Sequence, residues 1–358
     1  MVMPKLLSDL GQMFLIGFDG LSIKSGHPVI RAIEHENLGG VILFDRNING
    51  SRQNIESSGQ LKQLVSVLQQ HAEIPLLIAT DQEGGQVCRL KAEDGFPASR
   101  SAGSLSRCEL PEATVLMGKM AATLAEHGIN LNLAPVVDLA INPANPIISQ
   151  YDRSFGNSVD LVVRYASQFI KAHHLQGVAC CLKHFPGHGS SKQDSHLGFV
   201  DITDSWQDRE LGPYRQLFAA GYTDAVMTAH VVHRALDPQG LPATLSKDML
   251  YSLLRRQLGF SGLIISDDLQ MKAISHRWNF EDAVHMAVLA GVDLLVVGNN
   301  LVRDENVTAR GIRAIEKLLT TGQIKEKSID ESLARIAALK KKIAGEEAWK
   351  ENRHTALS

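Results

Sequence analysis

The sequence lacks the features of a membrane-spanning chain and of a chain that binds nucleic acid. Its longest apolar stretches run to seven or eight residues, whereas a helix that spans a bilayer needs about 20. The formal net charge is -3, with no run of five like charges, which argues against a nucleic-acid surface and favours a small or neutral partner. Asp9 and Gly11 interrupt the apolar N-terminus and only Lys5 could serve as its charged region, so we expect no signal peptide.

Cysteine is scarce, and linkers and repeats are absent. The four cysteines match no zinc-binding spacing, and the last two are adjacent and cannot easily bridge each other; they are Cys88, Cys108, Cys180 and Cys181. Reduced thiols in a cytoplasmic protein are the simplest interpretation. Since no Pro/Gly/Ser-rich linker and no repeat of 20 to 50 residues occurs, we expect one domain over 1–345, followed by a polar tail over 346–358.

Short apolar runs alternate with segments of helical spacing along the chain. The runs, each typical of a strand, are 12–18, 39–44, 75–80, 129–136, 178–183, 225–230, 262–266 and 293–298. The segments that predict helices are 27–36, 51–72, 111–127, 158–175, 207–220, 246–258, 280–291, 307–320 and 328–344. Nearly continuous apolar runs indicate parallel strands covered on both faces. Eight strand-helix units predict an α/β fold, the (β/α)8 TIM barrel; an open, doubly wound sheet is the alternative.

Polar residues follow five of the predicted strands. In a barrel, chemistry takes place at the carboxyl ends of the strands. The residues found there are Asp81, Asp138, Lys183, His184, His230, Asp267 and Asp268. Any one of them could be an ordinary solvated loop residue, but together they predict a site on one rim.

The segment 183–196 is the richest in chemical groups. His184 and His188 have the i, i+4 spacing of a helical metal site, but a proline and two glycines make a helix improbable there, so we expect no metal. The glycines also lack the full spacing of a phosphate-binding loop.

A third interpretation of this segment is a mobile loop that carries an acid/base pair. Asp194 and His196 lie two apart, so an extended backbone would point both side chains to one side. A carboxylate beside an imidazole fixes its tautomer and brings its pKa near working pH. A surface Asp-His hydrogen bond is the plainer alternative. Glycines upstream would let such a loop close over a substrate.

The adjacent carboxylates of Asp267 and Asp268 should face opposite ways on a strand. One can point into the barrel mouth as a nucleophile for a sugar carbon, while the other caps the next helix, the role we expect for Asp268. A carboxylate nucleophile with a separate acid is the scheme of retaining glycosidases. Lys183, Arg89 and Arg153 would supply donors to sugar hydroxyls. A Schiff-base aldolase using Lys183, and a barrel that binds sugar without catalysis, remain open.

Six motifs together resemble the family 3 glycoside hydrolases. They are DQEGGQVCR (81–89), NLAPVVDL (132–139), DRSFG (152–156), KHFPGHG (183–189), DSH (194–196) and SDDLQMKAI (266–274). The resemblance runs in order over about 10–300 and is strongest to the one-domain bacterial β-N-acetylglucosaminidases of cell-wall recycling. Two departures from the family's common GGRVQR and GHGDT forms, at 85–89 and 189–191, affect loop contacts and fine specificity and remove no residue with a chemical role.

The resemblance implies a role for eight residues. Asp267 would be the nucleophile, His196 the proton donor and acceptor, and Asp194 its partner. The sugar-binding positions would be Asp81, Arg89, Arg153, Lys183 and His184. The family further implies a retaining mechanism, no metal or organic cofactor, and cytosolic action on N-acetylglucosaminyl-1,6-anhydro-N-acetylmuramoyl peptides. A β-glucosidase or a phosphorylase of the same family is the alternative, and we expect a monomer.

Overall fold

The computed structural model describes residues 4–194 and 198–345. Eight parallel strands form its centre, one in each predicted range: β1 (Phe14–Ile16), β2 (Gly40–Ile42), β3 (Leu77–Thr80), β6 (Leu131–Asn132), β7 (Ala179–Phe185), β9 (Ala225–Thr228), β11 (Leu263–Ile265) and β12 (Leu295–Val297). Their order is β11-β9-β7-β6-β3-β2-β1-β12, and a parallel bridge between Ile265 and Leu294 joins the two ends. The predicted (β/α)8 barrel is therefore confirmed, and the open sheet is not formed.

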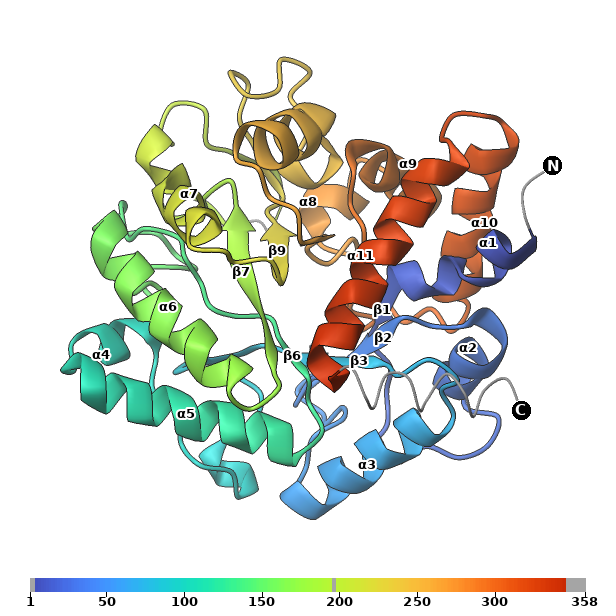
Figure 1. Cartoon of the computed structure of the whole chain (residues 1–358), viewed down its shortest axis with the longest axis horizontal. Helices are drawn as coiled ribbons and strands as arrows, with labels where there is room; N and C mark the ends of the chain where they lie inside the picture. The colour runs from blue at the N-terminus through green and yellow to red at the C-terminus, as the bar shows by residue number, and fades with distance from the viewer. Residues whose placement is uncertain (1–3, 195–197, 346–358) are drawn as a thin grey trace.

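Helices surround this ring and lie on its outside (Figure 1). The main ones are α2 (Pro28–Glu36), α3 (Ser58–Gln70), α5 (Leu110–Glu126), α6 (Val159–His174), α7 (Gly212–Ala219), the π-helical η5 (Asp248–Gln257), α9 (Phe280–Ala290), α10 (Val307–Thr320) and α11 (Glu326–Ala344). Each of the nine predicted helices has a counterpart here. In α6, for example, Val162, Tyr165, Phe169 and Ile170 are buried, which is the spacing of one apolar helix face turned toward a core.

The helix predicted over 51–72 begins later, at Ser58. The polar residues before it are buried, because the side chains of Gln53 and Asn54 both donate to the carbonyl oxygen of Phe18, over 2.9 and 3.0 Å. These bonds tie the segment to the end of β1 in a non-helical path. Ser57 then caps α3 by accepting from the amide of Gln60.

Small elements fill the connections; one of them lies within the helix predicted over 207–220, and the sequence did not predict the others. The small elements are α1 (Pro4–Ser8), η1 (Leu10–Met13), β4 (Gln82–Gly84), β5 (Val87–Cys88), η2 (Ala92–Asp94), α4 (Ala102–Ser106), β8 (Val200–Asp201), η3 (Asp208–Leu211), β10 (Val231–Val232), η4 (Ala243–Leu245) and α8 (Lys272–Ser275). Two pairs of them matter for the site: β4 and β5 form an antiparallel hairpin, and β8 pairs with β10 in parallel.

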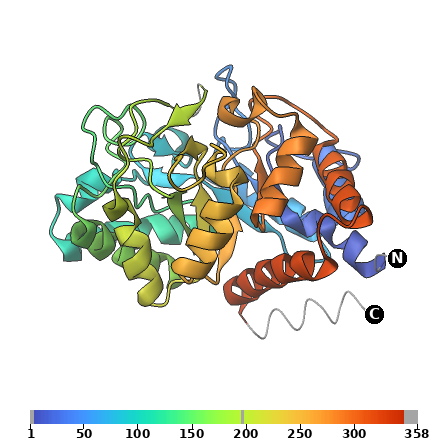
Figure 2. The same ribbon diagram turned by 90° about the horizontal axis from the view of Figure 1, so that it is seen from above.

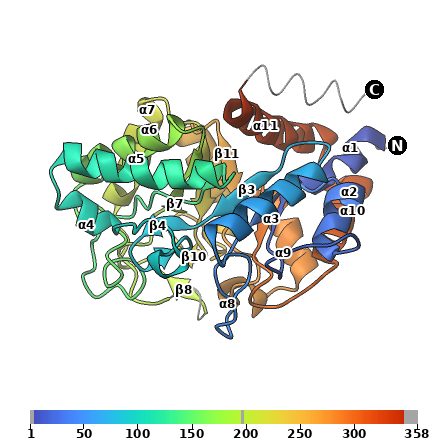
Figure 3. The same ribbon diagram turned by 90° about the horizontal axis from the view of Figure 1, so that it is seen from below.

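Helix α11 crosses the amino-terminal mouth of the barrel (Figure 1). Its Ser332 and Arg335 bond Asp293, which precedes β12, over 2.7 and 3.0 Å. Its Lys342 lies 2.6 Å from Asp224, which precedes β9. Figures 2 and 3 show the molecule from two further sides, and in Figure 3 α11 lies opposite β4, β8, β10 and α8. One mouth is thus closed by a helix, and the carboxyl-end mouth is left to the loops.

Within the described residues, no helix combines the length and apolar character that a membrane crossing requires. The division into one domain over 1–345 and a tail stays a prediction, because the residues of the tail lie outside those described.

Candidate active site

The residues predicted for the site come from strand ends that face one another. Asp81 directly follows β3, Lys183 and His184 belong to β7, and Asp267 comes two residues after β11. In the ring of eight strands, β3 and β11 stand opposite each other, with β7 midway along one arc. The proposed nucleophile and the proposed sugar-binding carboxylate therefore lie across the barrel mouth from each other.

Lys183 is the centre of a buried group of charges. Its side chain is 2% exposed, and its Nζ lies 2.7 Å from Asp81 Oδ1 and 2.7 Å from Glu83 Oε1. The guanidinium of Arg153 bonds both oxygens of Glu83, over 2.7 and 2.8 Å. Such bidentate pairs fix the position and orientation of both partners. Two predicted residues of the sugar-binding set are thus joined through one that was not predicted, Glu83.

The charges within this group keep every member ionised. Burial lowers the pKa of Lys183, but the carboxylates of Asp81 and Glu83 outweigh burial and raise it above its ordinary value. Burial likewise raises the pKa of Glu83, and the charges of Arg153 and Lys183 more than reverse this. A Schiff-base enzyme needs a neutral amine, and therefore a lowered lysine pKa. The raised pKa of Lys183 argues against the aldolase alternative.

His184 connects this charged group to the base of the following loop. Its Nε2 lies 3.3 Å from a terminal nitrogen of Arg153, and its Nδ1 lies 2.7 Å from Asp138 Oδ2. Burial raises the pKa of Asp138, but the charge and hydrogen bond of His184 outweigh it, so the pKa is lowered. The backbone amide of His188 also donates to Asp138, over 2.8 Å. Asp138 thus anchors both histidines from one buried point.

The base of the loop after β7 is held by close packing. A side-chain atom on Gly189 would meet the carbonyl oxygen of Leu139 at 1.7 Å, and Gly187 has φ +126° and packs against Glu210. Asn145 donates to the carbonyl oxygens of His188 and Gly189. These glycines permit close approach of the chain, and closure of the loop over a substrate stays a prediction. His184 and His188 lie on a strand end and a loop, so the helical spacing considered for a metal site does not apply.

Arg89 lies at the edge of the group, on the β4–β5 hairpin side. Its terminal nitrogens lie 3.6 Å from Asp45 and 3.6 Å from Asp81, and its guanidinium stands over the ring of Phe44, 5.5 Å from the centroid. Among the described residues, its buried Nε has no hydrogen-bond partner. Lys91 bonds Asp45 over 2.6 Å. Two carboxylates and an aromatic ring therefore fix the orientation of Arg89, whose side chain stays 26% exposed.

Of the two adjacent aspartates, Asp268 is used otherwise than expected. Asp268 Oδ1 accepts from the amides of Gln270 and Gly298, over 2.9 and 3.1 Å. The following helix α8 starts at Lys272 and has no side-chain cap. Asp268 therefore joins its own turn to the end of β12 instead of capping that helix. Asp267 Oδ1 accepts from the amide of Asp268 over 2.8 Å, and the residue is partly exposed at the mouth.

The predicted acid/base pair is described in part. Asp194 is partly buried, three residues beyond the buried Ser191. Ser191 is fixed by His188, whose Nδ1 lies 2.7 Å from its Oγ, and by Asn142, which donates to its carbonyl oxygen. His196 lies outside the described residues, so its pairing with Asp194 stays a prediction.

Sequence reasoning gave no role to Glu83 and Asp138, although it named the motifs that contain both. One signal was available for Glu83: it lies two residues after Asp81, and alternate residues of an extended strand point to one side. Asp45, which follows the apolar run of β2, was not among the residues predicted for the site. Each of these carboxylates orients a cation of the predicted set.

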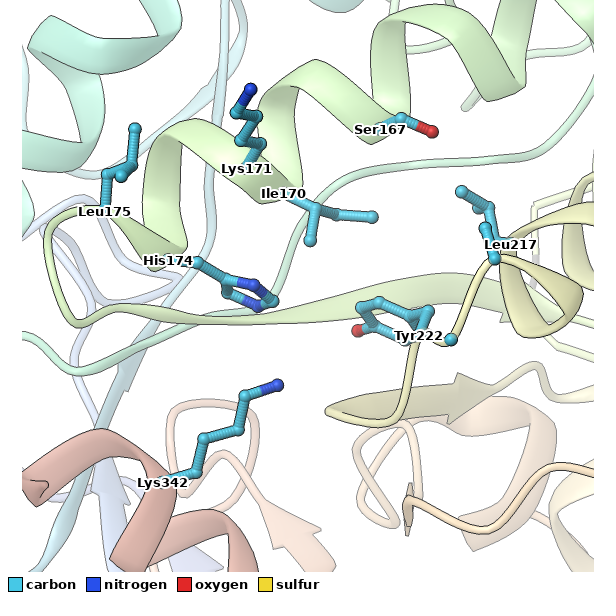
Figure 4. A pocket seen from close by; sticks show the side chains of 10 residues that line it. Ser167, Ile170, Lys171, His174, Leu175, Leu217, Tyr222 and Lys342 are labelled. Atoms are coloured by element: carbon cyan, nitrogen blue, oxygen red, sulfur yellow. The ribbon is translucent and has the colours of Figure 1, made fainter. Parts of the chain in front are cut away.

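A pocket of about 450 Å³ lies at the other end of the barrel, between α6, α7 and α11 (Figure 4). His174 and Lys342 line it and both bond Asp224, each over 2.6 Å. Asp224 precedes β9, so this pocket belongs to the amino-terminal side, where contacts in barrels serve stability. It is not the candidate active site.

Comparison with known proteins gives a consistent result. Residues 6–339 match the glycosyl hydrolase family 3 N-terminal domain. The chain is 40% identical over 275 residues to a β-hexosaminidase of Tolumonas auensis, covering 75% of this chain and 78% of that protein. A family 3 β-N-acetylglucosaminidase from a Paenibacillus species superposes with a TM-score of 0.86 at 34% identity, over 96% of this chain but 63% of that one.

A third relative matches over nearly its whole length. The β-N-acetylhexosaminidase of Beutenbergia cavernae superposes with a TM-score of 0.83 at 28% identity, over 94% of this chain and 98% of that one. The family match spans nearly the whole barrel, and the names of these relatives are those of enzymes that cleave glycosidic bonds. The chain belongs to glycosyl hydrolase family 3 and is a glycosidase of the β-hexosaminidase kind.

Proposed function

We propose that this glycosidase is a retaining β-N-acetylglucosaminidase that releases terminal N-acetylglucosamine from peptidoglycan fragments, through a covalent intermediate on Asp267. The observation that carries the proposal is the placement of Asp267 across the mouth from the buried group formed by Asp81, Lys183, Glu83 and Arg153. A sugar between them would meet a carboxylate on one side and fixed polar groups on the other.

The fixed groups suit the hydroxyls of a sugar. Asp81 is partly exposed and can accept from a hydroxyl with the oxygen that Lys183 leaves open. The side chain of Arg89 is 26% exposed beside Asp81 and can donate from its terminal nitrogens, and His184 lies next to Arg153 at the floor. Because these side chains are held by ion pairs before a ligand arrives, binding costs little ordering of the protein.

The reaction would proceed in two steps. In the first, the carboxylate of Asp267 attacks the anomeric carbon, the bond to the leaving oxygen breaks, and the imidazolium of His196 gives that oxygen its proton. In the second, a water molecule attacks the same carbon as neutral His196 takes its proton, and the bond to Asp267 breaks. Asp194 would hold the tautomer of His196 and stabilise its charged form. Configuration at the anomeric carbon is retained.

Turnover of aryl β-N-acetylglucosaminides tests the assignment. We expect the wild type to cleave the N-acetylglucosaminide much faster than the matching glucoside, and Asp267→Ala to remove turnover. Asp268→Asn is the matched control. Because the carboxylate of Asp268 accepts from backbone amides, we expect this substitution to lower the free energy of unfolding. At a temperature low enough to keep the variant folded, it should change kcat little. Equal turnover by wild type and Asp267→Ala would refute the nucleophile.

Histidine at the acid/base position leaves the site with one negative charge fewer than a pair of carboxylates. An anionic acceptor such as phosphate is then less strongly repelled, so a phosphorylase of the same family is the second candidate. Adding phosphate to the assay decides between the two. Release of free N-acetylglucosamine at an unchanged rate supports hydrolysis, and formation of N-acetylglucosamine 1-phosphate supports phosphorolysis.

We further propose cytoplasmic action on N-acetylglucosaminyl-1,6-anhydro-N-acetylmuramoyl peptides. Support comes from the sequence motifs and from the four cysteines, which are all free thiols in the structure. Reduced cysteines are usual in the cytoplasm. Digestion of purified muropeptides followed by mass spectrometry tests this substrate, and failure to release N-acetylglucosamine from them would exclude it.

A further inference from the structure

An exposed arginine at the carboxyl-end rim has aromatic neighbours and no carboxylate partner. The guanidinium carbon of Arg277 lies 5.4 Å from the ring centroid of Phe199 and 5.0 Å from that of Trp278. Over the described parts of the chain, its guanidinium takes part in no ion pair or hydrogen bond. Arg89 and Arg153, by contrast, are each held by carboxylates.

A series of contacts leads from this arginine to the residue that follows the proposed nucleophile. The pairing of β8 with β10 sets Val200 opposite Val231 in parallel register, so Phe199 stands beside His230. Neighbouring strands are about 4.8 Å apart. Nε2 of His230 lies 2.9 Å from the carbonyl oxygen of Asp268, the residue after Asp267.

The arginine also follows the nucleophile closely along the chain. Asp267 and Arg277 both lie in the connection from β11 to α9, which contains α8. In Figure 3, α8 and β8 lie on the same side of the molecule, opposite α11. Phe199 itself comes just after the segment that carries the proposed acid/base pair. The arginine therefore lies in the same rim connection as the proposed nucleophile.

The stacked arrangement fits a carboxylate ligand. Aromatic rings contact the face of a guanidinium and leave the N–H groups in its plane available. A planar fork of donors matches the two oxygens of a carboxylate. The ring of Phe199 is 40% exposed and can cover the apolar face of a sugar or a peptide stem. A positive charge beside exposed ring faces selects for an acidic group on an otherwise neutral or apolar ligand.

We propose that Arg277, oriented by Phe199 and Trp278, forms the subsite for the leaving group and selects leaving groups that bear a carboxylate. This inference rests on the proposed function, because it takes the sugar beyond the cleaved bond to be a muramic acid unit. Its lactyl group and an attached peptide are both sources of a carboxylate.

Three substrates that share the N-acetylglucosaminyl group and differ in the leaving group test the subsite. They are the N-acetylglucosaminyl disaccharide of anhydromuramic acid with a free lactyl carboxylate, its lactyl methylamide, and an aryl β-N-acetylglucosaminide. We expect Arg277→Ala to lower kcat/KM on the free acid roughly 10- to 100-fold, the range for a lost hydrogen bond to a charged group, chiefly through KM. Values for the amide and the aryl substrate should stay within about twofold, and Arg277→Lys should recover part of the loss.

Arg256→Ala is the matched control, since Arg256 is exposed on η5, away from this rim. We expect it to change none of the three rates. An equal loss on all three substrates with Arg277→Ala would show a structural role and overturn the proposal. Unchanged rates on all three would overturn it as well. A disaccharide carrying the peptide stem, compared with the same stem amidated, tells which carboxylate is bound.

A binding measurement separates this inference from the proposed function. Calorimetric titration of the free-acid and methylamide disaccharides into Asp267→Ala, with and without Arg277→Ala, needs no turnover. Weaker binding of the acid alone in the double variant supports the subsite, even if the wild type proves to cleave another substrate. Equal affinity in both variants would overturn the subsite while leaving the glycosidase assignment untouched.

Discussion

Glu83 is the residue that joins the two buried cations of the site, since it bonds both Lys183 and Arg153. Glu83→Gln removes one charge from the group and leaves the cations poorly compensated in a buried place. We expect a loss of about 3 to 5 kcal/mol in the free energy of unfolding, with a large loss of activity. Urea unfolding and turnover of an aryl substrate measure the two effects.

Glu281→Gln provides the matched control for this substitution. Glu281 forms the same bidentate pair with an arginine, Arg310, but at the surface, where such pairs contribute about 0 to 1 kcal/mol. Comparable losses from both substitutions would contradict the view that burial makes Glu83 important.

Glu210, under the loop that follows β7, gives a pH dependence of stability. Its side chain is buried, and burial together with the nearby charge of Asp138 raises its pKa to about 7 from an ordinary 4.5. Between these pH values the unfolded chain has lost the proton that the folded chain keeps. The free energy of unfolding should therefore fall as pH rises through this window, by about 3 kcal/mol, and Glu210→Gln should lack this contribution.

Urea unfolding of wild type and Glu210→Gln at several pH values checks the sign. The stability of the wild type relative to the variant should decline from pH 5 to pH 7 and then level off. A constant difference across this range would mean that Glu210 is already ionised in the folded protein.

At this scale the sequence located Asp81, Lys183 and Asp267 at strand ends, because an apolar run followed by a charged residue marks such an end. The partners that orient them were harder to find. Whether Glu83 points inward depends on the short hairpin after β3, and hairpin strands of two or three residues leave no periodic pattern to read.

Helix α11 contains a buried lysine that gives a second pH dependence of stability. Its Lys340 is buried and lies 2.7 Å from Gln12 Oε1, and burial lowers the pKa of this lysine to about 7 from 10.5. The folded state therefore disfavours the charged form, and this cost is largest below pH 7. Lys340→Met should raise the free energy of unfolding at pH 7, and the gain should shrink as pH rises and vanish only above the ordinary pKa of 10.5, where the unfolded lysine is also neutral.

Lys327→Met is the control on the same helix. Lys327 is exposed, and its one ion pair among the described residues, with Glu331, is long at 3.9 Å. Its effect should stay within about 0.5 kcal/mol at every pH. If Lys340→Met instead destabilises the protein at pH 7, then the bond to Gln12 outweighs the burial of the charge.

The elements themselves could be predicted where burial sets a period. All eight strands are buried on both faces, and continuous apolar runs reveal such strands. The late start of α3 could not be read from the sequence, because Gln53 and Asn54 look like helix residues until their bonds to Phe18 are known. Hydrogen bonds to a residue distant in the sequence therefore set the start of α3, and the local sequence pattern did not.

The eight strands form a ring in which β11 and β12 are joined by an isolated bridge instead of a paired ladder. We expect the closure of this ring to depend on the C-terminal helix that packs beside it. The bridge between Ile265 and Leu294 joins β11 to β12, and α11 bonds Asp293 beside this seam. Truncation after Thr321 removes α11 together with its buried side chains such as Ile336. It uncovers the parts of η1 and β11 against which α11 packs, and should abolish cooperative unfolding. Truncation after Gly345 should leave both the thermal midpoint and activity unchanged, as the predicted polar tail implies.

Differential scanning calorimetry of the two truncations distinguishes these outcomes. A lower midpoint or a lost activity after removal of 346–358 alone would contradict the predicted division of the chain. The order of eight strand-helix units was visible in the sequence, whereas the closing of one mouth by α11 was not, since no local pattern states which face of a barrel a final helix covers.

The central claim is that the barrel mouth holds a covalent nucleophile, Asp267, for an N-acetylglucosaminyl group. The most direct measurement is labelling with a 5-fluoro N-acetylglucosaminyl fluoride, which keeps the acetamido group and slows breakdown of an intermediate, followed by intact mass and peptide mapping. The account predicts one sugar per chain, attached to Asp267 and absent from Asp267→Ala. A label on Asp268, or inhibition with no covalent adduct, would contradict it.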